Sequence, residues 1–146
     1  LLSLSDVEVR QQLATDREAL GALIFTAPTG FASPFGNQDA RTAALVRAEG
    51  FTYQRGVGQH DDFTPPGDRG QWEPTTHCLG EVDSALDAFL AAVPASAPRR
   101  LWSLWGHSWE IDDHDSWGAL ERLLARLAAA DLWIATYAQV ATSLQH

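Results

Sequence analysis

Residues 101–115, LWSLWGHSWEIDDHD, hold the side chains best suited to chemistry. Alternation over 101–107 predicts a strand that is apolar on both faces, and Gly106 interrupts it just before His107. Such a strand is typical of an α/β protein, where reactive side chains gather at the carboxyl ends of parallel strands. An imidazole there titrates near neutral pH and can act as a general acid or base. Structural packing of the ring among Trp105 and Trp109 is the alternative, and the pattern leaves both open.

Carboxylates follow this histidine at Glu110, Asp112, Asp113 and Asp115. They can orient a ring nitrogen of His107, and together with His107 or His114 they supply hard and borderline metal ligands. The favoured interpretation needs no metal, because acids before "SWGALERLL" face the positive end of the next helix and can cap it.

Two further segments offer a cleft wall. "FASPFG", residues 31–36, is a strand end followed by a turn, which is either ordinary turn chemistry or a loop lining a sugar-binding cleft. "QWEPTTH", residues 71–77, places Trp72 and His77 in an irregular segment. Trp72 is either a stacking platform for a pyranose ring or a plug for the edge of a core, and His77 is interpreted as structural.

The elements around these residues alternate. Helices are predicted over about 6–20, with Ser5 and Glu8 forming a capping box, and over 38–49, capped by Asn37 and ended by Gly50. Further helices are predicted over 80–93, 115–131 and 137–145. Strands are predicted at 29–34, 51–57, 101–107 and 132–136, and "PASAPRR", residues 94–100, is a surface connection. This order predicts right-handed crossovers and a mainly parallel sheet, either open or part of a barrel.

Composition narrows the function classes. The chain has 146 residues, a formal charge of −9, and ten basic residues that are all arginine, so it offers no cationic stripe for nucleic acid. No apolar run is long enough to span a membrane. Cys78 is the single cysteine, which excludes an internal disulfide and a cysteine-based zinc cluster. The start lacks a secretory signal pattern, which slightly favours the cytoplasm, but the compartment stays open because preceding sequence could carry a signal.

Several of these residues together resemble the polysaccharide deacetylase family, the NodB-homology enzymes of carbohydrate esterase family 4. The resemblance rests on "GFASPFGNQDARTAALVRAEGFTYQRGV", on "QWEPTTH" and on "WSLWGHSWEIDD" with the following "LWIATYAQV", and covers nearly the whole chain. It implies that residues 1–146 are a single partial domain, the C-terminal part of an incomplete (β/α) barrel. The activity it implies is metal-dependent removal of acetyl groups from N- or O-acetylated carbohydrate.

The resemblance also implies roles for individual residues. His107 would be the catalytic acid, and Pro34, Phe35 and Gly36 would line the substrate groove, with Trp72 contributing. The divalent metal, zinc by expectation, would be held by residues that precede Leu1, so this chain alone would hold no metal and be inactive. Ala32 stands where many members of the family carry an arginine that holds the catalytic aspartate. The sequence therefore departs from the family's usual pattern at this position.

Two expectations follow for the chain as a molecule. A barrel arc leaves strand edges unpaired, so the chain expressed alone should self-associate. A non-catalytic carbohydrate-binding or structural α/β module is the alternative to an enzyme. The substrate polymer, and the choice between amide and ester, stay open.

Overall fold

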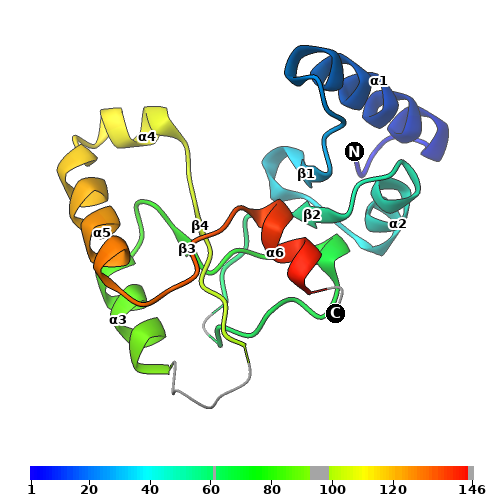
Figure 1. Cartoon of the computed structure of the whole chain (residues 1–146). Coiled ribbons are helices and arrows are strands. Elements are labelled where there is room, and N and C mark those ends of the chain that lie inside the picture. Colours follow the sequence, from blue (N-terminus) through cyan, green and yellow to red (C-terminus); the bar gives the residue numbers. More distant parts are fainter. Residues whose placement is uncertain (61, 93–98, 145–146) are drawn as a thin grey trace. The chain divides into compact units, whose positions relative to one another are not determined.

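The computed structural model describes residues 1–60, 62–92 and 99–144 (Figure 1). The chain is mixed α/β, and its strands pair in parallel. It divides into two compact units, which are described separately. Unit 1 comprises Leu1–Val57, Pro66–Glu73 and Ala135–His146, and unit 2 comprises Gly58–Pro65 and Pro74–Ile134. The connection predicted over 94–100 lies mostly outside the described residues.

Unit 1 begins with helix α1 (Asp6–Ile24), whose predicted capping box is confirmed: Ser5 Oγ accepts from Glu8 N–H, and the Glu8 carboxylate accepts from Ser5 N–H. Strand β1 (Gly30–Ala32) leads into the short 3₁₀ helix η1 (Pro34–Gly36). The rest of the unit is helix α2 (Ala40–Ala48), strand β2 (Tyr53–Arg55), the 3₁₀ turn η2 (Arg69–Gln71) and helix α6 (Tyr137–Ser143).

The core of unit 1 lies between α1, α2 and the start of β2. β1 and β2 pair in parallel with Phe31 opposite Gln54, and α2 is the crossover between them. The core cluster consists of Val9, Leu13, Leu45, Val46 and Phe51. The sequence placed the cap of α2 at Asn37, but Asp39 is the N-cap: its carboxylate accepts from Thr42 N–H at 2.7 Å. Asp39 reaches the exposed N–H groups of the first turn because it directly precedes the helix.

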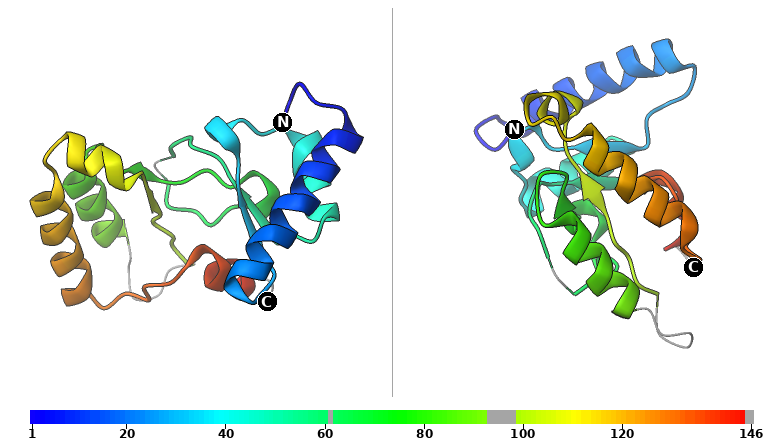
Figure 2. Two further views of the ribbon diagram at one scale, coloured as in Figure 1. Left: turned by 90° about the horizontal axis from the view of Figure 1, so that it is seen from above. Right: turned by 90° about the vertical axis from the view of Figure 1, so that its left-hand side faces the viewer.

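Unit 2 repeats the same strand–helix–strand order. Strand β3 (Thr76–His77) is followed by helix α3 (Val82–Ala92) and strand β4 (Leu104–Trp105), and the two strands pair in parallel with His77 opposite Trp105. Helices α4 (Ser108–Asp113) and α5 (Trp117–Ala129) complete the unit. Helices α3 and α5 lie side by side (Figure 2) and share the core cluster of Phe63, Leu86, Phe89 and Leu123.

Two sequence predictions in this region are wrong. "LWIAT", residues 132–136, is not a strand, because no strand among the described residues pairs with it to satisfy its backbone. The acids after His107 were expected to cap the helix over 115–131, but that helix (α5) has Ser116 as its N-cap with no side-chain capping bond. The acidic run instead lies mostly in α4, whose first turn is closed by Glu110. Among the described helices, none combines the length and the apolar character needed to cross a bilayer.

Candidate functional site

The candidate site lies at the carboxyl edge of the β3–β4 pair. Because the strands are parallel, their ends meet at one edge, so Cys78 follows β3 where Gly106 and His107 follow β4. The strands approach closely here: a Cβ built on Gly106 would lie 2.1 Å from Cys78 Sγ, and the Cys78 N–H donates to the Trp105 carbonyl at 2.8 Å. Gly106 is therefore needed for the close approach that places His107 beside β3.

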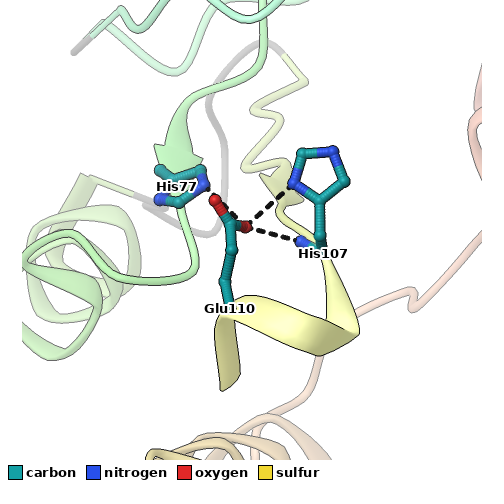
Figure 3. Close-up of side chains that lie close together, drawn as sticks. All are labelled: His77, His107 and Glu110. Carbon is teal, nitrogen blue, oxygen red and sulfur yellow. Dashed lines mark hydrogen bonds and ion pairs between the residues drawn. The ribbon is translucent and has the colours of Figure 1, made fainter. Parts of the chain in front are cut away.

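Two histidines and one glutamate converge at this edge (Figure 3). A single oxygen of Glu110, Oε2, lies 2.9 Å from His107 Nδ1, 3.2 Å from His77 Nε2 and 2.8 Å from the backbone N of His107. Glu110 is the third residue of α4, so its carboxylate turns back onto the residue that starts the helix, as in a capping box. The side chain of Glu110 is 14% exposed and that of His107 is 53% exposed.

The hydrogen bonds assign the protons on both rings. His77 Nδ1 accepts from Leu79 N–H at 3.3 Å, so a neutral His77 carries its proton on Nε2 and donates it to Glu110. His107 donates from Nδ1 to the same oxygen, which leaves its Nε2 with a free lone pair on an exposed ring. Nε2 is thus the ring nitrogen of His107 that is able to exchange a proton with a bound molecule.

The electrostatics of the site favour a charged Glu110. Partial burial of the carboxylate by itself would raise its pKa, but hydrogen bonds from the His107 ring and backbone N–H and positive charge on His77 and His107 outweigh it, so the pKa of Glu110 is lowered. For Cys78, burial and the neighbouring Glu110 charge raise the pKa of the thiol. Cys78 therefore stays protonated near neutral pH and is not an activated nucleophile.

Aromatic rings hold the two imidazoles. The Trp105 ring meets His77 edge-on with centroids 4.4 Å apart and His107 with centroids 6.0 Å apart, while His107 stacks on Trp109 at 5.4 Å. The packing of His107 against tryptophans, which the sequence offered as a structural alternative, is therefore present, and the side chain is also exposed. His107 packs among tryptophans and still presents one ring edge to solvent.

The same three side chains are of the types that bind metal ions. Their ligand atoms all lie within 4.8 Å of one another, and they form the one such group among the described residues. Their hydrogen bonding does not fit a metal ion, because ligation through His77 Nε2 would move the proton to Nδ1 and set it against Leu79 N–H. The aspartates after Glu110 join no such group, and Asp112 instead accepts a hydrogen bond from the Trp117 indole.

A cleft of about 440 Å³ borders the cluster within unit 2. Its lining includes Cys78, Leu104, Ile111, His114 and Leu123, but not the three residues of the cluster themselves. His114 Nδ1 donates to the backbone carbonyl of Glu110 at 2.9 Å and not to its carboxylate.

Pro34, Phe35 and Gly36, predicted to line the groove, form η1 in unit 1. Phe35 is 94% exposed and has a left-handed backbone (φ 57°), and Gly36 follows at φ 71°, where a Cβ would lie 2.0 Å from a Val57 methyl group. An exposed phenyl ring on a strained backbone is the kind of feature that is held for binding. Their role stays a prediction.

Trp72 belongs to the core of unit 1. Its side chain is 1% exposed, and its ring packs on Tyr53 and Tyr137 with centroids 5.9 and 4.7 Å away. A ring buried to this extent offers no face to a pyranose, so the structure favours core filling, the second of the two interpretations drawn from the sequence.

Sequence reasoning found His107 but did not join it to its partners. Glu110 was one of four acids considered as an orienting group, and its position three residues after a strand end was the available signal. His77 was interpreted as structural, because only the register of β3 against β4 brings it near Glu110.

Comparison of the chain with protein-family models, with curated proteins and with solved structures gives no match.

Proposed function

We propose that this chain is the C-terminal part of a metal-dependent carbohydrate deacetylase of the polysaccharide deacetylase type, in which His107 is the general acid. The observation that carries the proposal is the state of the His107 ring. It lies at the carboxyl edge of parallel strands with Nδ1 bound to a carboxylate and Nε2 turned away from it (Figure 3), on a side chain that is 53% exposed. That is how a proton donor at a substrate cleft has to be held.

The reaction needs such a donor when the acetyl group departs. Water adds to the carbonyl carbon of the acetyl group, and the carbon–nitrogen or carbon–oxygen bond to the sugar then breaks to give acetate. The departing nitrogen or oxygen takes a proton as that bond breaks, and His107 in its charged form supplies it from Nε2. Glu110 faces Nδ1 and stabilises the charged ring before this transfer.

The attacking half of the reaction lies with other residues. A divalent metal, which the resemblance implies on ligands outside this chain, supplies an activated water in enzymes of this type. No step is assigned to a metal on His77, His107 and Glu110, whose hydrogen bonding does not fit one.

We also propose the fold implied by the resemblance, an arc of an incomplete (β/α) barrel. Both strand pairs support it, since β1–α2–β2 and β3–α3–β4 are parallel strands joined by a crossover helix. The role that the resemblance implies for the exposed Phe35, contact with the acetylated sugar, is part of this proposal.

The test is acetate release from an acetylated oligosaccharide by this chain joined to its natural upstream sequence. His107→Ala should lower the rate about 10²–10⁴-fold, the usual contribution of a positioned acid. His60→Ala is the matched control, because the His60 ring pairs with Asp62 and belongs neither to the cluster nor to the cleft lining. Unchanged acetate release in His107→Ala would overturn the assigned role. Sugar binding without acetate release by the unaltered protein would instead establish the non-catalytic binding module.

A further inference from the structure

His77 has no part in the mechanism above, although its ring touches the centre of the site. Its side chain is 19% exposed and its Nε2 lies 3.2 Å from Glu110 Oε2. Its other nitrogen accepts from Leu79 N–H, so the ring is fixed at both ends. Because both ring nitrogens are bonded, the ring can hold the Glu110 carboxylate in a fixed position relative to strand β3.

Glu110 needs such a fixed partner. Its two contacts to His107 join residues of one turn, three positions apart, and would hold equally well if that turn moved as a body. Two contacts come from outside the turn, from His77 Nε2 and from Cys78 Sγ at 3.8 Å. The thiol is a weak hydrogen-bond donor at that distance, which leaves the imidazole N–H as the effective link between α4 and β3.

We propose that His77 is a positioning residue that anchors the Glu110 carboxylate to strand β3, so that Glu110 holds the His107 ring with Nδ1 inward and Nε2 toward substrate. The inference rests on the proposed function for its effect on catalysis. The geometric part concerns this chain alone and is tested without substrate.

The competing explanation is packing, because the His77 ring also meets Trp105 edge-on at 4.4 Å. Two substitutions separate the hydrogen bond from the ring. His77→Phe keeps an aromatic ring against Trp105 and removes the donor. His77→Gln removes the ring and keeps an amide N–H donor at a reach similar to that of Nε2.

The first measurement is the ring ¹⁵N chemical shifts of His107 near neutral pH, without substrate, in the protein joined to its natural upstream sequence. The unaltered chain should show the single Nδ1–H tautomer. His77→Gln should keep that tautomer, and His77→Phe should give shifts averaged over both tautomers. A tautomer kept in His77→Phe, or lost equally in both variants, would overturn the proposal. Amide spectra show that each variant is folded, and if His77→Phe does not fold, loss of the tautomer in folded His77→Gln overturns the proposal on its own.

The second measurement is acetate release by the same variants in the protein with its upstream sequence. His77→Phe should lower kcat about tenfold with KM changed by less than about twofold, because misplacing a reacting group slows the chemical step more than binding. His77→Gln should recover most of that loss. If the tautomers behave as expected while His107→Ala releases acetate normally, the anchoring stands and the proposed function fails. If the tautomers do not change as expected while His107→Ala loses acetate release, the proposed function stands and the positioning role of His77 is wrong.

Discussion

At the scale of single residues, the Glu110 carboxylate accepts hydrogen bonds from the backbone and ring of His107 and from the ring of His77. These interactions all favour its charged form, and together they lower its pKa despite partial burial. A carboxylate whose pKa is lower in the folded state than in the unfolded chain links stability to pH.

This linkage predicts the pH dependence of unfolding. Glu110 contributes stability that is fully present above its unfolded pKa of about 4.3, and the contribution is lost as pH falls through the lower folded pKa. In Glu110→Gln, the free energy of unfolding should therefore be lower near neutral pH, and its decline over the acidic range should be shallower than in the unaltered chain. Denaturant titrations at several pH values between about 7 and 3 measure both. A parallel decline in the two proteins would contradict the assignment.

From the sequence, it is easier to predict that a histidine able to exchange a proton lies here than to predict which residues surround it. His107 could be found because a glycine-interrupted apolar strand ends there, and that inference depends only on local pattern. His77 could not, because a two-residue strand in an irregular segment has no periodicity to reveal it. Trp72 was ambiguous for a related reason, since burial of a loop tryptophan depends on partners such as Tyr137 that lie far along the chain.

At the scale of elements, the helices were largely predictable from the sequence. Capping and apolar spacing placed α1, α2, α3, α5 and α6 within a few residues of their observed bounds. The strand predicted at 132–136 is wrong, and the sequence analysis did not predict the helix α4. A strand depends on a neighbour that local sequence does not show, and α4 is a short helix closed by a single glutamate.

Gly106 gives a test at this scale. Gly106→Ala should destabilise the protein by about 1–3 kcal/mol, because the added methyl group meets both Sγ and Cβ of Cys78 in a close-packed strand pair. Adding Cys78→Ala removes the sulfur and should restore part of the loss, while the Cβ contact at 2.8 Å remains. Thermal or denaturant unfolding measures the difference.

Gly67→Ala is the control for this pair, since a Cβ there meets nothing within 4 Å, and its effect should stay within about 0.5 kcal/mol. A Gly106→Ala variant as stable as the unaltered chain would show that β3 and β4 do not approach as closely as described.

At the scale of the whole molecule, both units expose groups that favour association. Among the described residues each parallel pair has two strands, so β1, β3 and β4 each have an edge without a strand partner, whereas the outer edge of β2 is bridged by Trp72. Several large apolar side chains are exposed, among them Phe25, Phe35, Trp133 and Ile134. The last two belong to the segment predicted as a strand, which has no strand partner among the described residues.

We therefore expect residues 1–146 expressed alone to form oligomers or aggregates, despite the formal charge of −9 that opposes them. Light scattering coupled to size-exclusion chromatography measures the mass. A concentration-independent monomer that melts in one cooperative transition would contradict this expectation.

The register of β3 against β4 has a consequence for how the site comes into being. His77 and Glu110 are distant in sequence, and they meet only after the crossover through α3 has closed and two residues of each strand have paired. Closing such a loop is entropically costly and the pairing that rewards it is short, so this contact belongs among the later events of folding and the earlier events of local opening. The amide hydrogen of Cys78, bonded to the Trp105 carbonyl, is released by the same opening, so its exchange with solvent reports on the opening that also breaks the His77–Glu110 contact.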